Sequence, residues 1–142
     1  GDRQAVTAFV DTSAFFAAVD VRDADHHAAV SLMSLDEPLV TSDHVLVETW
    51  SLVKRRFGPD VADRFWDGLR SGGASIESVK PVDLERAWAT GEVFADQGFS
   101  FVDRTSFAVM ERLGVYRVIT FDDDFAIYRF GRKRDRAFEV LR

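Results

Sequence analysis

Short apolar runs alternate along the chain with longer segments in which apolar residues recur at helical spacing. The short runs are rich in β-branched and aromatic residues and predict strands at 5–10, 39–40, 76–79, 116–120 and 138–140. The longer segments predict helices from 14, from 23–25 to before 36, and over 45–57, 59 to about 71–73, 83–97 and 103–113. Strands that alternate with helices favour an α/β domain with a mostly parallel central sheet.

Composition limits the class of protein. The 142 residues are enough for one domain over 1–142, and no linker or repeat divides them. The hydrophobic fraction of 46% and the charged fraction of 30% exclude a disordered chain. No cysteine is present, which excludes disulfides, thiolate zinc sites and cysteine nucleophiles. The longest apolar run, 14–19, is too short to span a membrane, and no charged-then-apolar leader opens the chain, so we expect a cytoplasmic protein with no membrane partner.

The charge balance argues against one class of function. Lys and Arg number 18 against 24 Asp and Glu, which gives a net charge of −6. An acidic protein does not attract nucleic acid by its net charge, so a passive nucleic-acid coat is disfavoured. An enzyme that meets phosphates through metal ions held by its carboxylates stays compatible with this balance.

Two aspartates follow predicted strands. Asp11 and Asp122 end the apolar runs at 5–10 and 116–120. In open parallel sheets, the functional groups gather beyond the carboxyl ends of the strands. Asp103 stands at the start of a predicted helix. Each residue also has an ordinary explanation, because Asp11 and Asp103 could cap helices and Asp122 could lie in a turn.

Glu48 differs because it stands inside a predicted helix, beside the apolar stripe, where capping cannot explain it. A carboxylate there is costly unless it is paired or binds a cation. The alternatives are a flanking surface position or an ion pair with Lys54, Arg55 or Arg56.

Together these four acids suggest a cluster that lacks an evident cationic partner. Like charges brought together raise each other's pKa, and a hard divalent cation with oxygen ligands, Mg²⁺ or Mn²⁺, relieves the repulsion. A metal of this kind activates water for attack on a phosphodiester. The residues therefore point to a metal-dependent phosphate enzyme.

Four blocks of sequence resemble the PIN-domain ribonucleases, and among them the VapC-type toxins of prokaryotic toxin–antitoxin pairs. They lie in the family's order and reach from one end of the chain to the other: Phe9-Val10-Asp11-Thr12-Ser13-Ala14-Phe15, Ser42-Asp43-His44-Val45-Leu46-Val47-Glu48-Thr49, Phe99-Ser100-Phe101-Val102-Asp103-Arg104-Thr105-Ser106-Phe107-Ala108 and Val118-Ile119-Thr120-Phe121-Asp122-Asp123-Asp124-Phe125. The resemblance implies a three-layer α/β/α sandwich and an endoribonuclease that uses Mg²⁺ or Mn²⁺. It also implies an RNA substrate, a homodimer and a cognate antitoxin that holds the toxin inactive.

The family's acidic residues carry over onto Asp11, Glu48, Asp103 and Asp122. Asp11 would bind the principal metal, Asp103 and Asp122 would complete its ligation, and Glu48 would hold a water or a second metal. The Thr-x-Asp pattern favours Asp122 as the fourth acid, with Asp124 as a possible outer ligand and Asp123 facing solvent.

Hydroxyl and basic residues accompany these acids. We expect one or two of Thr12, Ser13 and Thr120 to orient the carboxylates or the metal's water, although Thr12 or Ser13 could instead cap a helix. The candidate phosphate contacts are Arg104, the cluster of Lys54, Arg55 and Arg56, and the run of Arg132, Lys133 and Arg134 with Arg136. A water nucleophile needs neither the 2′-OH of RNA nor His44 as a base, so we expect a 5′-phosphate product.

Rival interpretations belong to other classes. A haloacid-dehalogenase-like enzyme needs a second acid two residues after the first, where this chain has Ser13. A response-regulator receiver needs an acidic pair near its first strand and a lysine at a strand end, and neither is evident in the sequence. An inactive PIN-like scaffold that binds RNA or protein stays open, as does a nuclease for structured DNA. The pair Phe15-Phe16 and Trp50 could line an apolar groove for the antitoxin or a second subunit.

Overall fold

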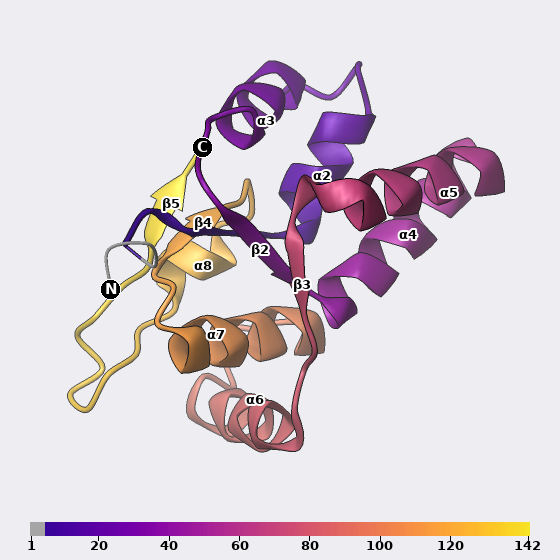
Figure 1. Ribbon diagram of the computed structural model, residues 1–142. Coiled ribbons are helices and arrows are strands. Elements are labelled where there is room, and N and C mark those ends of the chain that lie inside the picture. The colour runs from indigo at the N-terminus through magenta and orange to yellow at the C-terminus, as the bar shows by residue number, and fades with distance from the viewer. Residues whose placement is uncertain (1–4) are drawn as a thin grey trace.

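A five-stranded sheet lies at the centre of the molecule (Figure 1). The computed structural model describes residues 5–142. Its strands are β1 (Ala8–Val10), β2 (Leu39–Ser42), β3 (Ser75–Glu77), β4 (Arg117–Ile119) and β5 (Glu139–Leu141). They lie in the order β3-β2-β1-β4-β5, and every neighbouring pair is parallel. The predicted parallel sheet is therefore confirmed.

Helices fill the segments between the strands. They are α2 (Thr12–Val19), α3 (His26–Met33), α4 (Asp43–Phe57), α5 (Pro59–Gly68), the short π-helical turn η1 (Leu69–Gly73), α6 (Pro81–Val93), α7 (Phe101–Leu113) and α8 (Asp124–Ile127). Helices α2 and α3 lie on one side of the sheet and α6 and α7 on the other, while the α4–α5 hairpin extends to one side (Figure 1). This is the expected three-layer α/β/α arrangement. Within residues 5–142, no helix combines the length and the hydropathy needed to cross a membrane.

Several element boundaries differ from those expected. Strand β1 is only Ala8–Val10, because Ala5 and Val6 are helical and exposed to solvent. Helix α6 begins at Pro81, a residue suited to the first helical turn, and ends at Val93, four residues before the expected end. Helix α8 was not predicted, since four residues are too few to show a helical period.

The order in which the chain adds strands to the sheet reverses between β1 and β4. From β1 the chain moves outward to β2 and β3, and then crosses back to β4 on the other side of β1. Crevices at such reversals are where open α/β sheets bind ligands. The N–H of Asp11 donates to the carbonyl of Ile119 at 3.1 Å, which holds the ends of β1 and β4 together.

An aromatic cluster fixes α7 against the segment that follows β4. The rings of Phe107 and Tyr128 stack with centroids 4.1 Å apart, and Phe125 meets Phe107 edge-on at 5.0 Å. Phe107 and Phe125 are fully buried. Because α7 and α8 begin at Phe101 and Asp124, this cluster sets the relative position of the acidic residues at their starts.

Candidate metal centre and active site

Three carboxylates converge at the reversal between β1 and β4. Asp11, Asp103 and Asp122 each offer an oxygen, and these oxygens lie within 4.8 Å of one another. Asp11 follows β1, Asp122 follows β4, and Asp103 lies in the first turn of α7. Three segments that are far apart in the sequence thus contribute one acid each to a single cluster.

Helix capping does not account for these acids. The N-cap of α7 is Ser100, whose hydroxyl accepts the N–H of Asp103 at 3.0 Å. Asp11 occupies the N-cap position of α2, but its carboxylate makes no capping hydrogen bond. Asp11 and Asp103 are only 3% and 7% exposed, so both carboxylates are withdrawn from solvent towards the cluster.

Two hydroxyls orient the carboxylate of Asp11. Thr120 Oγ1 donates to Asp11 Oδ2 at 2.8 Å, and Ser13 Oγ lies 3.2 Å from the same oxygen. Both hydroxyls also accept backbone N–H groups of the segment after β4, Thr120 from Asp122 at 3.1 Å and Ser13 from Phe121 at 2.9 Å. The hydroxyl pair therefore ties the end of β1 to the turn that carries Asp122.

The cluster is electrostatically unfavourable without a cation. Burial raises the pKa of Asp11 to about 6, in spite of hydrogen bonds from Thr120 and the Thr12 N–H. Burial, a hydrogen bond with Asp124 and the nearby charges of Asp11 and Asp122 raise the pKa of Asp103 to about 8. Burial also raises the pKa of Asp122. In the described part of the chain, no Lys or Arg forms an ion pair with any of these three acids.

The donor set fits a hard divalent cation. The ligand atoms on offer are carboxylate oxygens, which Mg²⁺ and Mn²⁺ prefer. Thr12, next to Asp11, adds a buried hydroxyl that has no hydrogen-bond partner among residues 5–142. A bound cation would offset both the burial of these carboxylates and their mutual repulsion, which together raise the three pKa values.

The consecutive aspartates after β4 have different surroundings. Asp122 belongs to the three-acid cluster and accepts the N–H of Asp124 at 2.9 Å. Asp124 lies beside Asp103 and contributes to the raised pKa of that carboxyl. Asp123 is exposed and forms an ion pair with Arg142 at 2.7 Å. The structure thus places Asp122 and Asp124, but not Asp123, at the cluster.

Glu48 lies outside the group of three, in an adjoining pocket. It lines an open cavity of about 480 Å³ together with Asp43, His44, Val47 and Val102, the neighbour of Asp103. Glu48 has no hydrogen bond or ion pair in the described structure, so the alternative of a pair with the basic residues that follow it does not hold. Its carboxylate is half-buried and available at the edge of the site.

The basic residues expected near the site have separate environments. Arg104 donates from Nε to the Phe99 carbonyl at 3.0 Å and stacks on Phe101. Lys54 is exposed, with its ammonium group 5.4 Å from the ring centroid of Trp50. Arg132 is exposed in the loop before β5. Of these three, only Arg104 adjoins an acid of the cluster in the sequence.

Sequence reasoning missed two residues that shape the site. Ser100 fixes the first turn of α7, and a serine three residues before the acid was a readable capping signal. Thr105 contacts His44 Nδ1 through its hydroxyl at 3.2 Å and so links α7 to α4 beside Glu48. Nothing in the sequence indicated this second contact, because it joins residues 61 positions apart.

The sequence matches the PIN domain family over residues 8–131. The chain belongs to the PIN domain family. Among curated proteins, this PIN domain is 39% identical over 123 residues to the 23S rRNA-specific endonuclease VapC20 of Mycobacterium tuberculosis, in strains CDC 1551/Oshkosh and H37Rv, an alignment that covers 86% of this chain and 94% of the relative. The family resemblance read from the four sequence blocks is therefore confirmed.

Solved structures agree with this assignment. The crystal structure of Mycobacterium tuberculosis VapC20, a sarcin–ricin loop cleaving toxin, matches with a TM-score of 0.80 and 37% identity over 84% of this chain and 93% of that chain. VapBC2 from Rickettsia felis bound to a promoter DNA fragment matches with a TM-score of 0.67 and 12% identity, over 94% of this PIN domain and 96% of that chain. A toxin–antitoxin complex from Klebsiella pneumoniae matches with a TM-score of 0.62 and 14% identity, over 82% of this chain and 88% of that chain. At such low identity, the last two show the shared fold alone.

Proposed function

We propose that this PIN domain is an endoribonuclease that depends on Mg²⁺ or Mn²⁺ and acts as the toxin of a toxin–antitoxin pair. The observation that carries the proposal is the meeting of three buried carboxylates within 4.8 Å, with no basic side chain paired to them in residues 5–142. An inactive scaffold would gain nothing from buried acids whose repulsion it cannot relieve. The identity to an endonuclease across 94% of its length supports the same conclusion.

Each acid has a role that follows from its position. Asp11, Asp103 and Asp122 would hold the cation, and Asp124 would support Asp103 from outside. When bound, the cation supplies Lewis acidity, which activates water and stabilises charge on the phosphate. Glu48, unpaired at the edge of the site, would hold a water or a second metal ion when RNA arrives. Thr120 and Ser13 keep Asp11 in its orientation, while Thr12 has a free hydroxyl beside it.

We propose 23S rRNA, and within it the sarcin–ricin loop, as the substrate. VapC20 is a 23S rRNA-specific endonuclease and a sarcin–ricin loop cleaving toxin, and 39% identity over nearly its whole length makes its substrate the first to test. Water would attack phosphorus and the P–O3′ bond would break, which leaves a 5′-phosphate and a 3′-hydroxyl and does not use the 2′-OH. Arg104, Lys54 and Arg132 are candidates to contact RNA phosphates.

The proposed assembly is a cytoplasmic homodimer that is inhibited by an antitoxin, with one PIN domain over residues 1–142. An exposed apolar pocket of about 240 Å³ between α4 and α5, lined by Leu46, Val47, Trp50 and Trp66, is a surface on which an apolar partner segment could dock. Phe15 does not belong to such a groove, because it is buried against Phe65.

A cleavage assay tests the proposed activity. Purified protein is incubated with 23S rRNA in Mg²⁺ or Mn²⁺, with and without EDTA, and the products are mapped by primer extension. We expect one cut with a 5′-phosphate, abolished by EDTA and by Asp122→Asn, which keeps the size of the side chain and removes its charge.

The chain provides a matched control one residue away. Asp123→Asn removes the same charge from an exposed side chain whose one ion pair within residues 5–142 is with Arg142, so cleavage should persist. Cutting that survives in Asp122→Asn or in EDTA would contradict the metal-dependent mechanism. A wild-type protein that binds 23S rRNA but never cuts it would favour the scaffold.

A further inference from the structure

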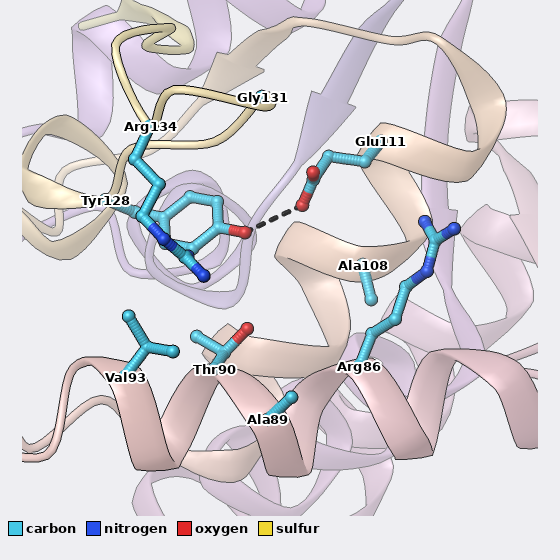
Figure 2. A pocket seen from close by; sticks show the side chains of 9 residues that line it. All are labelled: Arg86, Ala89, Thr90, Val93, Ala108, Glu111, Tyr128, Gly131 and Arg134. Carbon is cyan, nitrogen blue, oxygen red and sulfur yellow. Dashed lines mark hydrogen bonds between the residues drawn. The ribbon is translucent and has the colours of Figure 1, made fainter.

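A second polar pocket lies between α6, α7 and the loop that follows α8 (Figure 2). Its volume is about 290 Å³. Arg86 rises into it from α6, Arg134 reaches it from the loop on the opposite side, and Ala89, Thr90 and Ala108 form the surface between them (Figure 2). Small side chains thus line the part of the pocket between the two arginines.

Both arginines are free to bind a ligand. In the described structure, neither guanidinium group makes a hydrogen bond or an ion pair with the protein. The one acid in the pocket, Glu111, is engaged by the hydroxyl of Tyr128 at 2.7 Å (Figure 2). The charges of Arg86 and Arg134 both act to lower the pKa of Glu111, and these two guanidinium groups outnumber the one carboxylate among the lining residues.

The loop that carries Arg134 is held in a costly conformation. Arg134 has φ of 51°, the only positive φ outside glycine in residues 5–142, and its N–H donates to the Gly131 carbonyl at 3.1 Å. The base of the loop is closed by backbone hydrogen bonds between Phe130 and Arg136, and Arg136 stacks on Tyr116. Left-handed backbone at a non-glycine residue is uncommon and persists only where the surrounding structure holds it. The Arg134 side chain points from this loop towards α6 (Figure 2).

The pocket lies within reach of an RNA that occupies the acid cluster. Helix α7 carries Asp103 in its first turn and Glu111 eight residues later, a rise of about 12 Å. On the other side, α8 begins at Asp124 and leads directly to Tyr128. The same two helices therefore connect the acids to the second pocket.

We propose that this pocket binds a phosphate group of the RNA substrate, away from the bond that is cut. The inference rests on the proposed ribonuclease function and adds Arg86 and Arg134 as substrate-binding residues. Arginine donors in a fixed fork match phosphate oxygens. Arg132 and Lys133 lie in the same exposed loop, where they can meet neighbouring phosphates of the strand.

The test separates RNA binding from cleavage. Asp11→Asn protein, which we expect not to cut, is titrated in EDTA into a fluorescein-labelled hairpin of the sarcin–ricin loop, and anisotropy is read over a series of KCl concentrations. Arg86→Ala/Arg134→Ala in this background should weaken binding about 10- to 100-fold near 0.1 M salt. The slope of log K against log salt should also become less steep by about 1 to 2. Each phosphate contact that is lost means that about one counterion fewer is released when the RNA binds.

The control removes equal charge elsewhere. Arg22→Ala/Arg64→Ala changes two exposed arginines, one between α2 and α3 and one on α5, outside the pocket. A smaller loss of affinity and an unchanged salt slope in this control support the site. Equal effects of the two double variants would overturn it, because only net charge would then matter. A hairpin that the parent protein does not bind would overturn the proposed function as well.

Discussion

Asp11 owes its orientation to a hydroxyl that lies 109 residues away in the sequence. Thr120 Oγ1 donates to the carboxylate of Asp11 and accepts the backbone N–H of Asp122, so one side chain positions two acids. Hydrogen bonds behind metal ligands fix their orientation and typically change metal affinity by about 10- to 100-fold. Thr120 is thus a positioning residue rather than a ligand.

Replacement of this hydroxyl should weaken metal binding. We expect Thr120→Val to lower Mn²⁺ affinity by about 10- to 100-fold, because Asp11 loses the shorter of its two hydroxyl hydrogen bonds and the N–H of Asp122 loses its acceptor. Isothermal titration calorimetry measures the change. Thr120→Ser keeps the hydroxyl and should restore most of the affinity, whereas equal affinities in the valine variant and the wild type would contradict the role.

The raised pKa values make the metal-free protein less stable as the pH rises. Asp11, with a pKa of about 6, and Asp103, with a pKa of about 8, hold protons more tightly in the folded than in the unfolded state. The folded state therefore binds more protons between about pH 4 and pH 8, and the free energy of unfolding falls over that range. For Asp11 alone the loss is about 3 kcal/mol.

Urea unfolding in EDTA across this pH range measures the effect. Asp103→Asn, which cannot ionise, should flatten the decline. Added Mn²⁺ should stabilise the wild type more at pH 8 than at pH 5, since the cation replaces protons that are lost at the higher pH. A stability that rises from pH 5 to pH 8 without metal would contradict the arrangement of the cluster.

At the scale of single residues, the sequence identified the acids but not their relations. Asp11 and Asp122 could be placed because they end apolar strands that a parallel sheet brings to one edge. The Thr-x-Asp pattern already favoured Asp122 over its two neighbours, and in the structure Asp123 turns outward to Arg142. The separation of Glu48 from the other acids depends on the packing of α4 against α7, which no local pattern encodes.

One arginine joins three elements on the α6–α7 side of the sheet. Arg112, near the end of α7, donates to Asp83 of α6 from Nε at 3.0 Å and from Nη2 at 2.9 Å, and to Glu77 of β3 at 2.9 Å. Asp83 is fully buried. Loss of one member of a buried ion pair leaves an uncompensated charge, which is far more costly than loss of an exposed pair.

Arg112→Ala should therefore lower the free energy of unfolding by about 3–5 kcal/mol, as measured by urea unfolding at neutral pH. Arg70→Ala is the matched control, because Arg70 forms an exposed pair with Asp67 at 3.6 Å. Its effect should stay below about 1 kcal/mol. Similar losses in both variants would show that the Arg112 network contributes no more than a surface pair.

At the scale of elements, hydrophobic spacing identified the strands and the longer helices. It worked best for α4, where Gly58 and Pro59 mark the end of the helix. It failed where elements are short: α8 has four residues, and Ala5 and Val6 read as strand although they are helical. Tertiary contacts decide such segments, as the burial of Phe125 against Phe107 does for α8.

At the scale of the whole molecule, α6 exposes large apolar side chains to solvent. Leu84 and Trp88 are one turn apart and 40% and 64% exposed. Exposed aromatic side chains of this size are typical of protein interfaces. This face of α6 is therefore our candidate contact for the proposed homodimer.

Trp88→Glu should convert the dimer to a monomer, because it places a charge at the centre of an apolar contact. Light scattering coupled to size-exclusion chromatography measures the mass at several protein concentrations. Val21→Glu is the control, since Val21 is 75% exposed between α2 and α3, on a different side of the molecule. A dimer that survives Trp88→Glu would assign the interface elsewhere.

The most direct test of the whole account is the binding of Mn²⁺ to the acid cluster, followed by calorimetry on wild type, Asp11→Asn and Asp123→Asn. We expect saturable binding with release of protons in the wild type, since Asp11 and Asp103 are partly protonated without metal at neutral pH. Asp123→Asn should bind like the wild type, and Asp11→Asn should lose the site. Binding that is unchanged in Asp11→Asn, or absent from the wild type, would contradict a metal centre at this cluster.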